Sequence, residues 1–170
     1  SSLKQTFTVI RTDKGAHTML IKDLNEWKVF AHLVNDEGMT NLNAKLEADV
    51  NLGSEINMVG NVSSKDYSGT FDGQNHTLTL NWNANTNDIA PFRRVKNATI
   101  KNLRTEGTIK SSSYFLGGLI DEATGGSNTV ANCVSAVNIT SSYASDRCGA
   151  GGLISYIYTN TQVTITDCLV

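Results

Sequence analysis

The clearest pattern of apolar and polar positions is a helical stripe near the N-terminus. Apolar residues recur at spacings of three and four, as Leu24, Trp27, Phe30, Ala31 and Val34. Asp23 is suited to cap the first turn, with Glu26 three positions later, and Gly38 is suited to end the helix. The pattern predicts one amphipathic helix from about Asp23 to Glu37. Because no other segment has helical periodicity, its apolar face must pack against non-helical structure.

The remaining apolar residues follow the pattern of short strands. An alternating stretch and a second apolar patch lie between residues 5 and 21 and are separated by the turn-prone Asp13-Lys14-Gly15, which predicts two strands. From Leu46 onward, each apolar run ends at Asn, Gly, Ser or Asp within a few residues. Trp82 follows Leu78 and Leu80 with a period of two, so it is expected in the core.

Two short motifs recur along the second half of the chain. Residues 98–103, 128–133 and 163–168 align without gaps, and each has Thr, a β-branched aliphatic residue, Asn or Asp, and Leu or Cys at the same places. Between them lie Gly117-Gly118-Leu119-Ile120 and Gly151-Gly152-Leu153-Ile154, with Ala90-Pro91-Phe92 as a degenerate first copy. The period is about 30 residues, and the last copy has extra length in the loop at 141–147.

A repeat of two or three short strands cannot bury its apolar face alone, so successive copies must stack around one core. The sequence therefore predicts an all-β parallel β-helix, a solenoid with the helix as an N-terminal cap. Stacking predicts one inward column of Ile100, Val130 and Ile165 and another of Leu103, Cys133 and Cys168. It also predicts turns at Asn102, Asn132 and Asp167, where stacked Asn side chains form a ladder. The doubled glycines would allow close backbone approach.

This organisation divides the chain into three segments of one structural domain. Residues 1–21 are expected to form strands or a linker, residues 22–52 the capping helix and first strand, and residues 53–170 the coils. The chain stops at Cys168-Leu169-Val170, inside a repeat strand, which predicts exposed apolar surface there and either truncation, a following coil or end-to-end packing.

Composition narrows the classes of partner. Lys and Arg number 14 against 16 Asp and Glu, so the net charge of −2 offers no surplus for nucleic acid. No run is long enough to span a bilayer, and the first residues lack the features of a signal peptide. Three cysteines without C-x-x-C spacing favour free thiols over a disulfide framework or a zinc site.

Residues 20–170 resemble the bacterial GLUG-motif proteins. The segment 69–76, Gly-Thr-Phe-Asp-Gly-Gln-Asn-His, is the most specific part of this resemblance. The sequence departs from the family pattern where Asp121 and Ser155 follow Gly-Leu-Ile, since the family usually has glycine there. The resemblance implies a right-handed parallel β-helix from a surface or secreted adhesin-like protein, so we expect an extracellular or cell-surface location.

Catalysis in β-helices requires clustered carboxylates facing a groove. The candidate acids are Asp66, Asp72, Asp88, Asp121, Glu122, Asp146 and Asp167. Asp121 and Glu122 are expected to point to opposite faces of a strand. Asp72, His76 and Asp88 are the candidate catalytic residues of an alternative in which the chain is an enzyme, although Asp72 and His76 fit a turn better. We expect no catalytic residues, metal or cofactor: His17 and His32 lack metal-spaced partners, and no EF-hand loop is present.

Tyrosines in irregular segments are the candidate ligand-binding residues, because planar rings stack on sugars and anchor protein contacts. They are Tyr67, Tyr114, Tyr143, Tyr156 and Tyr158, and Tyr143 lies in the inserted loop. We therefore predict a non-catalytic, adhesin-like domain that binds a glycan or a host surface protein. The alternatives are a polysaccharide lyase or glycoside hydrolase and a structural spacer within a larger surface protein.

Overall fold

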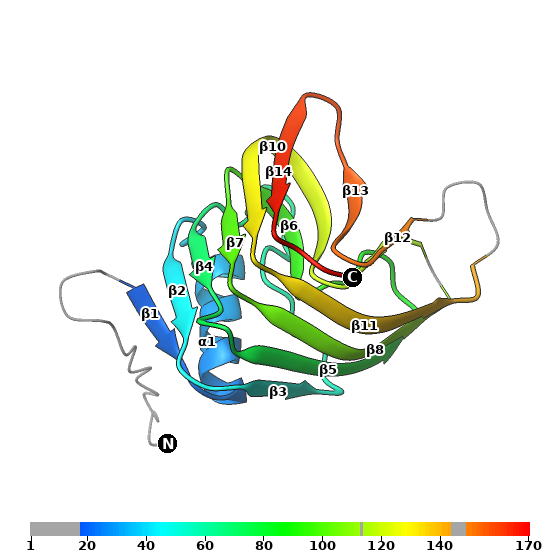
Figure 1. Cartoon of the computed structure of the whole chain (residues 1–170), viewed down its shortest axis with the longest axis horizontal. Helices are drawn as coiled ribbons and strands as arrows, with labels where there is room; N and C mark the ends of the chain where they lie inside the picture. The colour runs from blue at the N-terminus through cyan, green and yellow to red at the C-terminus, as the bar shows by residue number, and fades with distance from the viewer. Residues whose placement is uncertain (1–17, 113, 144–148) are drawn as a thin grey trace, which may run out of the picture.

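The chain forms a parallel β-helix, closed at one end by a helix (Figure 1). The computed structural model describes residues 18–112, 114–143 and 149–170. Every strand pairing among these residues is parallel, including the isolated bridges. The predicted fold class is confirmed. The first of the two strands expected before the helix falls within residues 1–17, outside the described residues.

The first sheet runs along the whole solenoid. Its strands, in spatial order, are β1 (Thr18–Ile21), β2 (Asn43–Leu46), β4 (Thr70–Asp72), β7 (Thr99–Lys101), the second half of β10 (Ile120–Ala131) and β14 (Thr161–Thr166). Because β1 pairs with β2, the segment before the helix is part of the solenoid.

The second sheet lies across the lower edge of Figure 1 and contains β3 (Val50–Gly53), β5 (Thr77–Ala84), β8 (Arg104–Ser111) and β11 (Val134–Ser141). The third consists of β6 (Phe92–Lys96), the first half of β10 and β13 (Ile154–Ile157). The short strands β9 (Leu116–Gly117) and β12 (Ala150–Gly151) pair at the corner between them. Strand β10 thus passes from the third sheet into the first.

The predicted inward columns are present. In the first sheet, Ile100 pairs with Val130 and Val130 with Ile165, and the same column continues backwards through Phe71, Ala44 and Met19. In the second column, the Cys133 N–H donates to Cys168 Sγ over 3.4 Å, and both thiols are free. Trp82, also expected in the core, is fully buried opposite Ile109. Each coil therefore covers the apolar side chains of its neighbours.

The predicted turns are held by left-handed residues and an amide ladder. Asn102, Asn132 and Asp167 have φ angles of 53°, 51° and 53°. Asn132 Nδ2 donates to Asn102 Oδ1 over 2.9 Å, and Asn102 Nδ2 donates to Asp72 Oδ1 over the same distance. Asn tolerates this backbone region better than most residues, and its amide bonds along the stacking direction.

The doubled glycines have the close contacts that were expected of them. A Cβ on Gly117 would lie 1.9 Å from the Ile120 carbonyl oxygen, and one on Gly118 would lie 2.1 Å from that of Gly152. Side chains are therefore excluded at this corner.

Helix α1 (Leu24–Asn35) closes the N-terminal end of the core. Asp23 caps it by accepting from the Glu26 N–H at 3.0 Å, and Gly38 follows with a φ of 74°. The helix ends two residues before the predicted Glu37. Trp27 packs edge-on against Phe71 and Phe92, with centroid separations of 5.8 and 5.9 Å. The helical stripe is thus continuous with the core of the coils.

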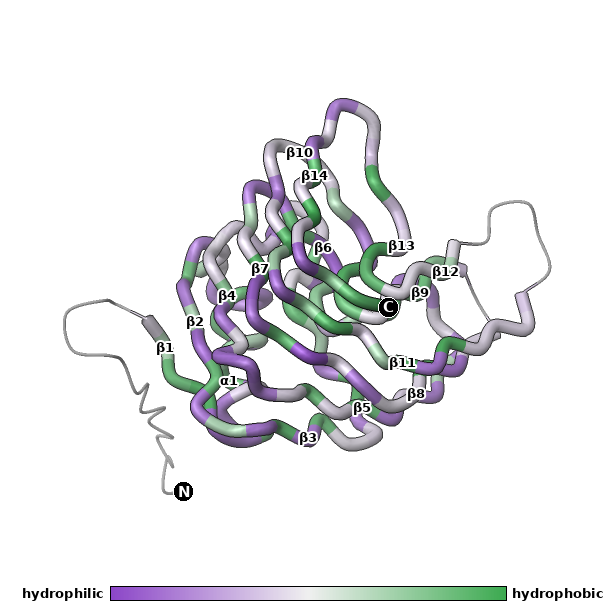
Figure 2. Tube along the Cα trace, viewed as in Figure 1, coloured by the Kyte–Doolittle hydropathy of each residue, from purple (hydrophilic) through white to green (hydrophobic). Residues whose placement is uncertain are grey.

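The opposite end exposes apolar side chains, as expected. Ile165, Leu169 and Val170 are exposed, Val170 by 74%. In Figure 2 the tube is green, the colour of hydrophobic residues, where it ends at the C-terminus. Within the described part of the chain, no helix has the length and apolar character to cross a bilayer.

We predict that Asn102→Ala lowers the free energy of unfolding by about 2–3 kcal/mol. The substitution removes two side-chain hydrogen bonds and places alanine, which cannot form such bonds, in the left-handed backbone region. Asn102→Gly removes the bonds but suits the backbone, so its loss should be about 1 kcal/mol. Urea unfolding followed by circular dichroism measures both. Equal losses for the two variants would show that the backbone conformation contributes nothing.

Candidate functional site

Four of the five candidate tyrosines lie together in one row of aromatic rings. The order is Tyr143, Tyr114, Phe115, Tyr156, Tyr158, and each neighbouring pair has a ring-centroid separation of 5.1 Å. We call these five residues the aromatic row. Tyr156 and Tyr158 are 43% and 39% exposed, and the other three are partly buried. The row is therefore continuous and open to solvent at one end.

The stacking of coils places these rings side by side. Tyr114 and Phe115 lie between β8 and β9, Tyr143 follows β11, and Tyr156 and Tyr158 lie in and directly after β13. They thus belong to consecutive coils, although up to 44 residues separate them in the sequence. Tyr67, the fifth candidate, is fully buried, and its hydroxyl donates to the Leu42 carbonyl oxygen. The prediction that Tyr67 belongs to a binding surface was therefore wrong.

Phe115 is a member of the row that the sequence analysis did not name. It lies in the same irregular segment as Tyr114, so the criterion of aromatics outside regular structure could have found it. Its φ of 59° is uncommon for a bulky residue, and Asp88, one coil earlier at the same corner, has a φ of 63°. Strained backbone of this kind is concentrated at functional sites.

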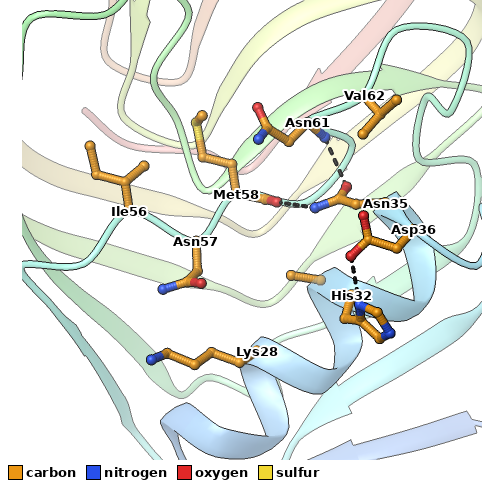
Figure 3. A pocket seen from close by; sticks show the side chains of 10 residues that line it. Lys28, His32, Asn35, Asp36, Ile56, Asn57, Met58, Asn61 and Val62 are labelled. Atoms are coloured by element: carbon orange, nitrogen blue, oxygen red, sulfur yellow. Dashed lines mark hydrogen bonds and ion pairs between the residues drawn. The ribbon is translucent and has the colours of Figure 1, made fainter.

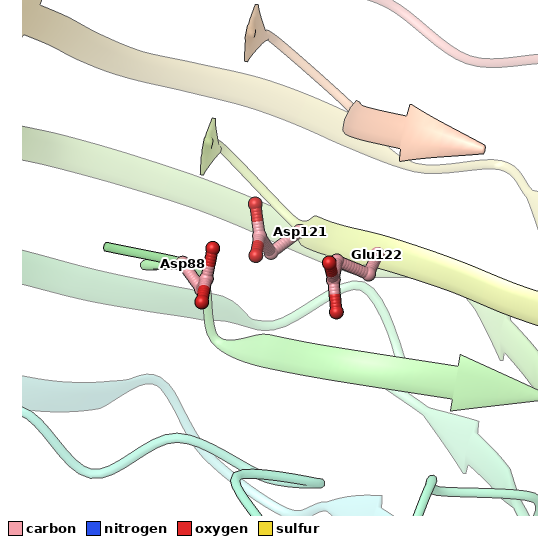
Figure 4. Close-up of side chains that lie close together, drawn as sticks. All are labelled: Asp88, Asp121 and Glu122. Atoms are coloured by element: carbon pink, nitrogen blue, oxygen red, sulfur yellow. The ribbon is translucent and has the colours of Figure 1, made fainter. Parts of the chain in front are cut away.

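An acidic cluster lies beside the Tyr158 end of the row. Asp88, at the corner before β6, and Asp121 and Glu122, at the start of β10, each have a carboxylate oxygen within 4.8 Å of the others (Figure 4). The Tyr158 hydroxyl donates to Glu122 Oε1 over 2.9 Å, and the Asp88 N–H donates to the Tyr114 carbonyl oxygen over 3.3 Å. The cluster and the row are therefore one continuous region.

Asp121 and Glu122 do not point to opposite faces, contrary to the expectation from strand alternation. Ile120 and Ala123 both enter the core, so the two residues between them face away from it together. Opposite them in the preceding coil are Arg93 and Arg94, which have the same arrangement between Phe92 and Val95. Alternation fails because two residues, not one, separate the inward-facing Ile120 and Ala123.

Two arginines hold the cluster from the preceding coil. Arg93 Nη2 contacts Asp88 Oδ2 at 2.6 Å, and Arg94 Nη1 contacts Glu122 Oε2 at 2.7 Å. Arg94 Nε also contacts Asp66 Oδ1 at 2.8 Å, while Thr124 donates to the other oxygen of Asp66. The carboxylates of Asp88 and Glu122 are therefore fixed in position.

Asp121 is the exception, since its side chain is completely buried and neither carboxylate oxygen has a hydrogen-bond partner. Ser155 lies opposite it in the next coil, but its hydroxyl donates to the Gly149 carbonyl oxygen at 3.2 Å. Burial, together with the charges of Asp88 and Glu122, raises the pKa of Asp121 to about 8. The Ser155 side chain and the charge of Arg93 offset this rise only in part, so an ionised Asp121 is incompletely compensated within this chain.

The alternative catalytic residues do not converge. Asp72 lies in a turn, where it accepts from the Gln74 N–H at 3.0 Å, and His76 Nδ1 lies 3.2 Å from Asp49 Oδ1. Both precede β5, whereas Asp88 follows it, and an eight-residue strand spans about 26 Å. Asp72 does line an open depression of about 360 Å³, with Lys45 and Lys101 rather than His76 or Asp88.

A second depression, of about 240 Å³, lies between α1 and residues 56–62 (Figure 3). Its polar groups bond to one another: Asn35 Nδ2 donates to the Met58 carbonyl oxygen at 2.8 Å, and the Asn61 N–H donates to Asn35 Oδ1 at 2.9 Å. His32 Nδ1 contacts Asp36 Oδ2 at 2.5 Å. The two Asn35 bonds join the helix to the loop, and the His32 contact lies at the C-terminal end of the helix.

Of the remaining candidate acids, Asp167 occupies the turn described above, and Asp146 lies outside the described residues, as does Cys148. No family model, curated protein or solved structure matches this chain.

We predict that Asp121 makes stability fall with rising pH. The pKa is raised in the folded state, so between about pH 4 and pH 8 the unfolded chain releases a proton that the folded chain retains. Relative to Asp121→Asn, the free energy of unfolding in metal-free buffer should fall by up to about 1.4 kcal/mol per pH unit in this window and level off above it. Urea unfolding of both proteins from pH 4 to 9 measures this difference. A difference that does not vary with pH would contradict the prediction.

Proposed function

We propose that this chain is a non-catalytic β-helix of a bacterial surface or secreted protein and that it binds a polysaccharide along the aromatic row. The observation that carries the proposal is the unbroken series of ring contacts from Tyr143 to Tyr158, ending in two exposed tyrosines.

Planar rings suit the apolar faces of sugars, and tyrosine adds a hydroxyl that can bond to sugar hydroxyl groups. A tyrosine also has few rotatable bonds, so its immobilisation on binding costs little entropy. The strands next to these residues pair from coil to coil, which fixes the spacing of the rings. These properties support binding by a preformed surface.

The shape of the row favours a chain-like ligand over a single sugar. Successive centroids are 5.1 Å apart across two coils, so a ligand that follows the row can contact several rings in turn. Each ring would contribute modestly, and the affinity would depend on several rings acting together. This argument favours a polysaccharide over a compact protein epitope.

The geometry does not favour the enzyme alternative. His76 and Asp88 lie at opposite ends of β5, and Asp121 and Glu122 are buried rather than aligned on an open groove. A polysaccharide-active enzyme needs its acid and base on one substrate. The proposed extracellular or cell-surface location depends on the resemblance to GLUG-motif proteins, and fractionation of the source cells tests it.

We predict that the chain binds members of a polysaccharide array and that Tyr156→Ala lowers the affinity at least about fivefold, because removal of an exposed aromatic contact costs more than about 1 kcal/mol. Tyr156→Phe is the matched control, since it retains the ring and should bind within a few-fold of the original protein. Titration calorimetry with the best-bound polysaccharide measures both.

Two outcomes would overturn this function. One is that the chain binds no polysaccharide of the array but binds a host surface protein through the aromatic row. This result would favour an adhesin that recognises protein. The other is release of unsaturated or reducing ends from the polysaccharide, which would favour the enzyme. Unchanged binding by Tyr156→Ala would place the site elsewhere on the solenoid.

A further inference from the structure

We propose that Asp88, Asp121 and Glu122 form a calcium-binding site at the corner between the second and third sheets. This inference goes beyond polysaccharide binding and can be tested without it. It begins with the geometry: each residue places a carboxylate oxygen within 4.8 Å of the others (Figure 4). Because two Ca²⁺–O bonds together span about 4.6–5.2 Å, one ion can contact all three oxygens.

The state of Asp121 is the second, independent observation. Its side chain is fully buried, and both of its oxygens lack a partner in the protein. A buried polar group without a hydrogen bond destabilises a fold, and a buried charge does so more strongly. A cation bound among the three carboxylates would supply the missing partner for Asp121.

The balance of charge supports a divalent ion. Four carboxylates meet here, those of Asp66, Asp88, Asp121 and Glu122, when Asp121 is ionised. Arg93 and Arg94 make the arginine ion pairs to this group. Two negative charges therefore remain uncompensated by these pairs, which is the charge that one divalent cation neutralises.

The ligand atoms select the kind of cation. All three residues offer hard carboxylate oxygens, which suit Ca²⁺ and Mg²⁺, whereas zinc sites usually include His or Cys. The carboxylates come from two coils, and arginines orient those of Asp88 and Glu122, so two of the three ligands are held in fixed positions. Mg²⁺ would require bonds of about 2.1 Å and near-octahedral order, whereas Ca²⁺ tolerates irregular geometry.

The surrounding contacts leave lone pairs of the carboxylates free for coordination. Asp88 uses Oδ2 for Arg93, while Glu122 uses Oε2 for Arg94 and Oε1 for the Tyr158 hydroxyl. Each carboxylate oxygen has a second lone pair, so these bonds can persist while the ion binds. Such outer contacts orient ligands in metal sites, and here they would come from Arg93, Arg94 and Tyr158.

The experiment uses the whole chain after treatment with a chelator. We expect CaCl₂ to raise the melting temperature of the protein by about 5–10 °C when the free calcium concentration is about a hundred times the dissociation constant of the site. Asp121→Asn should remove this rise. Glu106→Gln makes the same change in net charge on β8, where Glu106 pairs with Arg104, and should keep it. An equal rise with MgCl₂ would overturn the assignment to calcium.

Terbium provides a spectroscopic measurement that does not depend on stability. Tb³⁺ in the site would lie close to the Tyr158 ring, because the hydroxyl of that ring donates to Glu122. Excitation of tyrosine should produce terbium emission that CaCl₂ displaces, and Tyr158→Phe should weaken the emission while the thermal shift with calcium persists.

The absence of a calcium shift in the original protein, or a full shift in Asp121→Asn, would overturn the site. Should Asp121→Asn fail to fold, Asp88→Asn replaces it, and an undiminished calcium response in that variant would overturn the site equally. Loss of polysaccharide binding in Tyr156→Ala without loss of the calcium response would separate the two proposals.

Discussion

The structure depends on the alignment of equivalent apolar side chains from one coil to the next. The column from Met19 through Phe71 and Val130 to Ile165 shows this constraint most directly, since each member pairs in register with the next. A strand slipped by one residue would turn its apolar side chains outward. The amide ladder and the close-packed glycines fix the same register at the turns and corners. The aromatic rings packed around Trp27 fix it at the N-terminal end.

The candidate site follows from the same constraint, because it uses positions that the core does not need. Asp121 and Glu122 lie between two core residues, and Asp88 and Phe115 share a corner where the chain turns between sheets. Side chains at such places stack across coils as the core residues do. Residues far apart in the sequence can therefore form a row or a cluster without a dedicated loop scaffold.

The sequence predicted the coil repeat, the inward columns, the ladder and the helical cap, because these features recur at fixed spacing and their periodicity is visible in one chain. It also named four members of the aromatic row. It did not predict that they adjoin, since the contacts of Tyr143 with Tyr114 and of Tyr156 with Phe115 join residues outside the two repeat motifs. It also misjudged Asp121 and Glu122, because alternation holds for a regular strand and these residues lie where the third sheet departs from it. Tyr67 was misassigned because its burial depends on packing against the helix. The residues next to Tyr67 in the sequence give no sign of this packing.

Asp121 and Ser155 face each other in adjacent coils. Glycine at both positions would leave the corner with neither a carboxylate nor a hydroxyl group. The chemistry of this buried corner therefore depends on these two side chains rather than on the backbone.

The free thiol at the centre of the second column has a consequence for redox behaviour. Burial raises the pKa of Cys133 to about 12, and the thiolate is the form that reacts with oxidants. At pH 8 only about one molecule in ten thousand would carry it. The packing that makes Cys133 a small apolar residue therefore also slows its oxidation.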